Sequence, residues 1–249
     1  FQIIEGFNTK NYGTTNYQDY NMKIVAVRIG DKYGPEYETY LEEKLPEHEF
    51  IWVREPIRHD VTLQWNKMYG MGLDLDEPIC VMDIDIILEN DYQKVFDFPI
   101  ERGEFAAMPG WWRDSNKEFE INGGFFKYYP KDMKHIYDIF MKDVDYWQQH
   151  FIKNGVTKGP VNGEQHFVEQ HVRETPGLTL KLLPNEWFTR WHSQFNMSDK
   201  QYVTWQYKLT EKYKALTGND YIWMGEFHED IKFVHFTHSQ NKPTDWIHK

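Results

Sequence analysis

Short apolar runs alternate with helix-like stretches in the N-terminal part of the chain, and this alternation restricts the possible folds. Lys23–Ile29, Phe50–Arg54 and Ile79–Leu88 are apolar runs of strand length. Glu36–Leu45 and Val61–Met71 lie between them and have the spacing of helices. Strands separated by helices predict an α/β protein with a mixed, mostly parallel central sheet flanked by helices. Ligands of such sheets bind beyond the carboxyl ends of the strands, so the loops after the first and third strands are the places to search for a site.

The sequence also predicts how the chain is divided and where its further strands and helices lie. We expect residues 1–22, which are polar and without a period, to form an N-terminal arm or leader, and residues 23–249 to form a single domain. The further predicted elements are strands at Phe105–Met108, Gly123–Tyr128 and Phe233–Phe236, a helix from Pro130 to Trp147, and a helix from Ser198 to Leu216 that begins with a capping box.

The charge of the chain excludes some classes of partner. The net charge is −11, so the protein as a whole repels nucleic acid and anionic membranes, and an anionic ligand requires local cations. The sequence contains no apolar run long enough for a transmembrane segment, and we expect a cytoplasmic protein. The single cysteine, Cys80, lies in an apolar run and is expected to be a buried thiol.

Two aspartates, Asp83 and Asp85, interrupt the apolar run Ile79–Leu88. Residues two apart in a strand point to the same face, so the two carboxylates can converge. Two such charges beside apolar neighbours are unfavourable unless a cation neutralises them or one is protonated. Mg²⁺ or Mn²⁺ is the simplest remedy, because both accept carboxylate oxygens. An isolated Asp-x-Asp also suits a strand end that directs its acids into solvent. Further ligand residues elsewhere in the chain are needed to distinguish a metal site from such a strand end.

The last predicted strand and the segment after it contain partners of the required kind. His235 is flanked by apolar residues, and Lys242 precedes Pro243. Taken singly, the first suits a core histidine and the second a solvated lysine. Together they suit a site in which a neutral imidazole completes the metal shell and an ammonium meets a diphosphate. A departing nucleoside diphosphate accumulates negative charge, which both groups can stabilise.

Four separated segments, in this order, resemble signature segments of the GT-A glycosyltransferases, and within them the glycogenin and lipopolysaccharide galactosyltransferase group (glycosyltransferase family 8). They are Arg28–Tyr33, Trp65–Lys67, Asp83–Asp85, and His235 with Lys242 and Pro243. The segment Ile121–Phe126 is similar to the Asn-containing segment that lines the sugar pocket in this family. Gly163–Gln165 is similar to a Gly-Asp-Gln motif beside the anomeric carbon, with Glu164 where the family usually has Asp.

The resemblance implies a role for each matched residue. It implies Mn²⁺ or Mg²⁺ bound by Asp83, Asp85 and His235, and catalytic roles for Glu164, Gln165 and Asn122. It also implies nucleotide-binding roles, which fall to Arg28, Gly30, Asp31, Tyr33, Lys67, Asp83 and Lys242.

The implied reaction is transfer of a sugar from a nucleotide-diphosphate sugar, with uridine as the implied base. The implied acceptor is a hydroxyl group of a glycan, a lipid-linked or a protein-linked molecule, and the implied stereochemistry is retention. Glu164 would stabilise or attack an oxocarbenium-like centre, while Gln165 and Asn122 would hold sugar hydroxyls. Two alternatives remain: a sugar-nucleotide nucleotidyltransferase, and a non-catalytic carbohydrate-binding module. The loop at Asp31 lacks the glycine-rich basic pattern of the first, and the intact acidic pair with His235 argues against the second.

Three other groups of residues permit more than one interpretation. Trp111–Asp114 suits a wall of the sugar site or a packed loop equally well. Trp187, Phe188, Trp191 and His192 could shape an acceptor pocket, although a core cluster is the preferred interpretation. His166 and His171 have helical spacing without an acidic or cysteine partner at matching spacing, and we predict that they lie on the surface.

Overall fold

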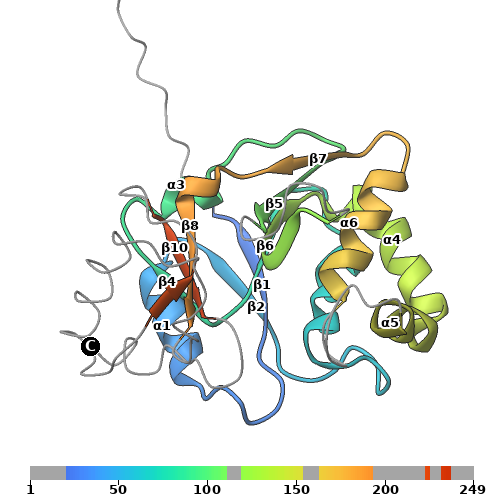
Figure 1. Cartoon of the computed structure of the whole chain (residues 1–249), viewed down its shortest axis with the longest axis horizontal. Helices are drawn as coiled ribbons and strands as arrows, with labels where there is room; N and C mark the ends of the chain where they lie inside the picture. Colours follow the sequence, from blue (N-terminus) through green and yellow to red (C-terminus); the bar gives the residue numbers. More distant parts are fainter. Residues whose placement is uncertain (1–20, 111–118, 154–162, 193–221, 225–230, 237–249) are drawn as a thin grey trace, which may run out of the picture.

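The computed structural model describes residues 21–110, 119–153, 163–192, 222–224 and 231–236 (Figure 1). Four sequence predictions lie outside these ranges. They concern the N-terminal arm up to residue 20, the segment Trp111–Asp114, the helix Ser198–Leu216 and Lys242.

A six-stranded sheet forms the centre of the described part of the chain. Its order is β2-β1-β3-β6-β5-β7, and β6 runs antiparallel to both of its neighbours while the other pairs are parallel. This arrangement confirms the predicted α/β class with a mostly parallel sheet. The strands are β1 (Lys23–Val27), β2 (Glu49–Val53), β3 (Ile79–Met82), β5 (Glu104–Pro109), β6 (Ile121–Tyr128) and β7 (Thr179–Leu182).

A second sheet has four strands in the order β4-β10-β8-β9. They are β4 (Ile86–Leu88), β8 (Phe188–His192), β9 (Ile222–Met224) and β10 (Phe233–Phe236). The prediction of one continuous strand over Ile79–Leu88 is therefore wrong, because the chain leaves the central sheet after Met82 and enters the second sheet at Ile86. The backbone N–H of Asp83 still bonds a central strand, at Gly124 O (2.9 Å), whereas Asp85 O accepts from Phe236 N of the second sheet (2.9 Å).

The helices differ from the predicted ones mainly in how they are divided. The stretch predicted as a helix at Val61–Met71 is a 3₁₀-helix followed by one α-turn, and Asn66 Nδ2 donates to the carbonyls of Val61 and Leu63 there. The helix predicted behind Pro130 breaks at Asp143, where Arg58 Nη1 donates to Met141 O (2.8 Å). The helices are α1 (Glu36–Lys44), η1 (Leu63–Met68), α2 (Tyr69–Gly72), α3 (Gln93–Phe96), α4 (Pro130–Lys142), α5 (Val144–Lys153), α6 (Glu164–Glu174) and η2 (Asn185–Trp187).

The central sheet is covered on both faces, because alternate residues of its strands enter two different apolar clusters. Ile24 and Cys80 pack in the cluster with α1 and the second sheet. Val25 and Val81 pack in the cluster with η1 and with α4, α5 and α6, which gather on one side of the sheet (Figure 1). Cys80 is a fully buried thiol, as predicted, and burial raises its pKa to about 12. Among the described residues, no helix combines the length and apolar character needed to cross a membrane.

Candidate active site

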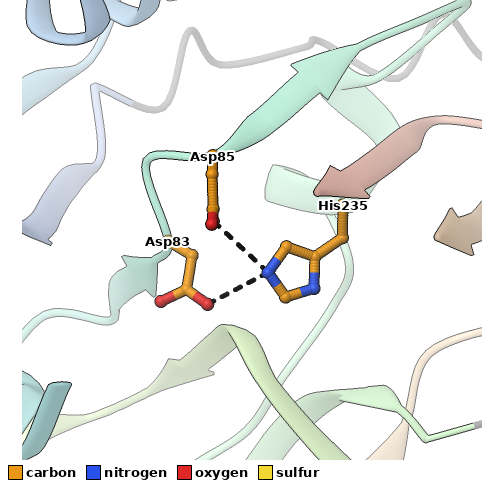
Figure 2. Close-up of side chains that lie close together, drawn as sticks. All are labelled: Asp83, Asp85 and His235. Atoms are coloured by element: carbon orange, nitrogen blue, oxygen red, sulfur yellow. Dashed lines mark ion pairs between the residues drawn. The ribbon is translucent and has the colours of Figure 1, made fainter. Parts of the chain in front are cut away.

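Three side chains predicted as metal ligands converge where the two sheets meet. His235 comes from β10, and Asp83 and Asp85 come from the crossing between β3 and β4 (Figure 2). His235 Nε2 lies 3.2 Å from Asp83 Oδ2 and 3.3 Å from Asp85 Oδ1. One ligand atom from each residue lies within 4.8 Å of the others. The carboxylates converge as predicted, although a bend in the chain produces this arrangement and one straight strand does not.

The second oxygen of each carboxylate has a partner of its own. Lys67 Nζ donates to Asp83 Oδ1 (3.1 Å), and the Tyr33 hydroxyl donates to Asp85 Oδ2 (2.6 Å). Burial raises the pKa of Asp83, but Lys67 and His235 outweigh it and hold that pKa below its usual range. Burial and the adjacent Asp85 raise the pKa of Tyr33 above its usual range, so its hydroxyl remains a donor. Asp83 is thereby kept as a carboxylate.

The donor set suits a divalent cation. Two carboxylate oxygens and one imidazole nitrogen are ligands that Mn²⁺ accepts, and hard oxygens also suit Mg²⁺. Burial lowers the pKa of His235, but hydrogen bonds to Asp83 and Asp85 outweigh it and raise the pKa to about 9. The imidazolium thus balances the two carboxylates in the position where a cation would do so. Within the described structure, His235 Nδ1 is buried without a hydrogen-bond partner.

Lys67 joins the acidic pair to Glu164. Its ammonium lies 3.3 Å from Glu164 Oε2 and donates to Gly123 O at 2.7 Å. Glu164 is the first residue of α6 and is 3% exposed. Burial raises its pKa to about 7; Lys67 opposes this shift and Asp83 adds to it. Glu164 Oε1 is buried and has no hydrogen-bond partner among the described residues. The structure thus places Glu164 beside the metal-type cluster, with one oxygen unpaired.

An irregularity in β6 brings Asn122 and Gln165 to the same place. The register between β5 and β6 shifts after Ala107, which releases the N–H groups of Gly123 and Gly124 from β5. Gly123 N donates to Gln165 Oε1 (2.7 Å), and Gly124 N donates to Asn122 Oδ1 (2.8 Å). Both amide oxygens are therefore engaged, which leaves the NH₂ groups as the donors that each amide can offer a ligand.

Gly123 allows this close approach because it lacks a side chain. A Cβ there would lie 3.0 Å from Lys67 Nζ and 3.1 Å from Glu164 Oε2. Gly163, which precedes α6, has φ +131°, a backbone conformation that favours glycine, and a Cβ there would lie 2.8 Å from Phe151 Cβ. The two glycines thus permit Glu164 and Lys67 to meet beside β6.

Glu169 is a residue of the site region that sequence reasoning missed. It is fully buried on α6 and accepts the backbone N–H groups of Glu120 (2.9 Å) and Ile121 (3.1 Å). Arg173 Nε donates to its carboxylate at 3.0 Å. The four-residue spacing from Gln165 to Glu169 and on to Arg173 is the signal that could have indicated it. Gln165 and Glu169 together attach α6 to the start of β6.

The two histidines of α6 are buried, so the prediction that they lie on the surface is wrong. His166 is 3% exposed and its ring lies 4.5 Å from that of Phe119. His171 is 8% exposed, contacts the ring of Phe167 at 4.1 Å and lies 2.8 Å from Phe167 O through Nδ1. Burial lowers the pKa of His171. Both rings act as packing groups because α6 is covered on more than one face.

The loop after β1 is joined to the cluster through Tyr33. Gly30 and Asp31 are exposed on this loop, and no hydrogen bond or ion pair within the described structure links either of them, or Arg28, to the cluster. Arg28 pairs instead with Glu38 of α1, which also accepts from Arg54 Nη2 (2.6 Å). Burial raises the pKa of Glu38, but the two guanidinium groups outweigh it and lower that pKa.

The aromatic group near residue 188 belongs partly to the core. Phe188 is fully buried with its ring 5.7 Å from that of Phe233, and Trp187 packs against the same cluster. The core interpretation is confirmed for these two residues. Trp191 and His192 belong to β8, but the placement of their side chains lies outside the described structure.

The fold is the GT-A fold that is known from glycosyltransferase structures. The structure is similar to the galactosyltransferase LgtC in complex with donor and acceptor sugar analogs, with a TM-score of 0.53, 12% identity, and coverage of 90% of this chain and 92% of LgtC. It is also similar to the glycosyltransferase GlyE of Streptococcus pneumoniae TIGR4, with a TM-score of 0.51 and 11% identity. That match covers 90% of this chain but only 56% of GlyE. No protein-family model and no curated protein sequence matches the chain.

Proposed function

We propose that the protein is a metal-dependent glycosyltransferase that transfers a sugar from a UDP-sugar to a hydroxyl acceptor with retention of configuration. The convergence of Asp83, Asp85 and His235 beyond the carboxyl end of β3 carries the proposal. In α/β sheets this is where ligands bind. The shared fold with LgtC, which binds donor and acceptor sugar analogs, supports the same assignment.

The cluster would hold Mn²⁺ or Mg²⁺ through Asp83, Asp85 and His235, and the cation would stabilise the charge of the departing diphosphate. Lys67 contributes by keeping Asp83 ionised from the side opposite to His235. We assign Lys242 to the diphosphate, and the loop with Arg28, Gly30, Asp31 and Tyr33 to the nucleoside, on the sequence resemblance alone. The acceptor is a hydroxyl group of a glycan, a lipid-linked or a protein-linked molecule.

Glu164 is the group proposed to face the reacting sugar carbon. Its unpaired Oε1 can place negative charge next to an oxocarbenium-like centre, while Oε2 stays anchored to Lys67. Asn122 and Gln165 would hold the sugar through their NH₂ groups, because the backbone of β6 engages both amide oxygens. Each amide then selects acceptor atoms of the ligand, and that fixes the orientation of the sugar.

Thermal unfolding with Mn²⁺ and a panel of nucleotides tests the proposal most directly. A ligand that binds only the folded state raises the free energy of unfolding by about 2.7 kcal/mol when its free concentration is a hundred times Kd. The melting temperature rises as a result. We expect the rise to require both the cation and a nucleoside diphosphate, with UDP the most effective. No rise with any nucleotide would favour a carbohydrate-binding module.

Turnover and product analysis test the chemistry. We expect slow hydrolysis of a UDP-sugar to free sugar and UDP when no acceptor is present, whereas a nucleotidyltransferase would release pyrophosphate from a nucleoside triphosphate and a sugar phosphate. NMR of the transferred product reports its configuration, and an inverted product would overturn the assignment of retention. Full transfer activity in Glu164→Gln would exclude both roles considered for that carboxylate.

A further inference from the structure

We propose that Tyr33 is a positioning residue for the metal ligand Asp85, so that the loop between β1 and α1 belongs to the cation site. The inference rests on the proposed metal site. It gives Tyr33 a role in metal binding, besides the nucleoside-binding role that the resemblance implies. Its basis is the way in which the four carboxylate oxygens of the cluster are divided between partners.

Each carboxylate directs one oxygen inward and the other outward. Asp83 Oδ2 and Asp85 Oδ1 face His235 Nε2, at 3.2 and 3.3 Å. The opposite oxygens are taken by Lys67 on Asp83 (3.1 Å) and by the Tyr33 hydroxyl on Asp85 (2.6 Å). A carboxylate with one oxygen hydrogen-bonded in this way has its orientation fixed, and the other oxygen remains the natural ligand. Tyr33 and Lys67 thus occupy equivalent outer positions.

The two outer partners differ in charge, and the difference matters for a cation. Lys67 compensates Asp83, and also lies 3.3 Å from Glu164. Tyr33 is a neutral donor, which orients Asp85 without cancelling its charge. Tyr33 therefore places no compensating charge beside Asp85, whose side chain is only 13% exposed.

The ring of Tyr33 is held by its surroundings in the orientation that this task requires. The fully packed Tyr37 of α1 meets it edge to face, with ring centroids 4.7 Å apart at 61°. Lys32 Nζ lies 4.4 Å above the ring. The hydroxyl is therefore aimed at Asp85 by contacts on α1 and on the loop itself. By linkage, a cation at Asp85 would favour this loop conformation, and the loop conformation would favour the cation equally.

Direct titration of the nucleotide-free protein with Mn²⁺, followed by isothermal calorimetry or by the EPR signal of free Mn²⁺, tests the inference. Tyr33→Phe removes one oxygen and keeps the ring, and we expect the Kd for Mn²⁺ to rise about tenfold, as is usual for loss of an outer-shell partner. Tyr92→Phe is the matched control, because the Tyr92 hydroxyl donates at 2.7 Å to Lys44 O on the surface. We expect its Kd to equal that of the wild type.

The outcomes separate the inference from the proposed function. Wild-type protein that does not bind Mn²⁺ would overturn the metal site itself. Wild-type binding together with an unchanged Kd in Tyr33→Phe would overturn only the role of Tyr33. Circular dichroism and the metal-free melting temperature of each variant show whether it is folded. The rise in melting temperature on adding Mn²⁺, measured against the same variant without metal, gives a second estimate of affinity.

Discussion

The central sheet and the second sheet supply the candidate site in different ways. On the central side, Asp83 is bonded through its backbone to β6 and through its side chain to Lys67, which also bonds β6 at Gly123 O. On the other side, Asp85 is bonded through its backbone to β10, the strand that carries His235. On the central side, Asp83 is therefore held by several hydrogen bonds and its charge is compensated by Lys67. On the side of the second sheet, the positions of Asp85 and His235 depend on contacts between distant segments.

The largest expected effect comes from removing the ligand on the central side. Asp83→Asn keeps the shape of the side chain but removes the charge, so we expect donor hydrolysis to fall about a thousandfold and Mn²⁺ binding to be lost. Asp74→Asn removes one acid whose side chain is 95% exposed, and should leave both measurements unchanged. Activity within a few-fold of the wild type in Asp83→Asn would show that the central sheet supplies no essential metal ligand.

The next effect tests whether Lys67 is the anchor of that side. Lys67→Met leaves the half-buried Asp83 and the buried Glu164 side by side without their shared cation, so we expect a loss of about 3–5 kcal/mol of unfolding free energy. Urea denaturation without metal measures it. Lys94→Met, which breaks the exposed pair with Asp91, should change stability by less than about 0.5 kcal/mol. Equal effects of the two substitutions would show that Lys67 anchors nothing.

The same contrast explains what could be predicted from the sequence. The strands of the central sheet are continuous apolar runs with helices between them, so local pattern was sufficient for β1, β2, β5 and β6. The edge strand β7 (Thr179–Leu182) was missed, because its side chains are partly exposed and carry little pattern. In the second sheet, the strand Phe233–Phe236 was predicted from local pattern, but its pairing with short segments from distant parts of the chain leaves no local signal.

The site was predicted for a partly incorrect reason. Asp83 and Asp85 do converge, but through the crossing between two sheets that looked like one apolar strand. His235 was selected because, together with the acidic pair and Lys242, it suits a site for a metal and a diphosphate. Glu169 was missed, since a buried carboxylate that binds backbone N–H groups resembles any helical acid in the sequence. The oxygens that pair with Tyr33 and Lys67 depend on side-chain orientation, which spacing does not determine.

The pH dependence of activity tests whether ionised Glu164, which pairs with Lys67 beside the central sheet, is required for the reaction. Its pKa of about 7 means that the carboxylate is formed as pH rises through about 7. If it acts as an anion, kcat/KM should fall about tenfold for each pH unit below 7, and Glu164→Gln should lose this limb of the profile. The sign for stability is opposite. The raised pKa favours the folded state below the ordinary value of 4.5, and this contribution is lost as pH rises through 7. A profile that is the same in both proteins would separate Glu164 from the chemistry.

The smallest expected effect comes from making the same core substitution in each sheet and comparing the change in Mn²⁺ binding. Phe233 and Phe105 are both fully buried, the first in β10 among Phe96, Phe125 and Phe188, and the second in β5. Replacing either by Leu should cost about 1 kcal/mol of unfolding free energy, measured in urea. Only Phe233→Leu changes the strand that holds His235, so only this variant should weaken Mn²⁺ binding, by a few-fold. Equal weakening in both variants would mean that the cluster responds to stability in general. A change confined to Phe233→Leu would show that the second sheet sets the metal geometry.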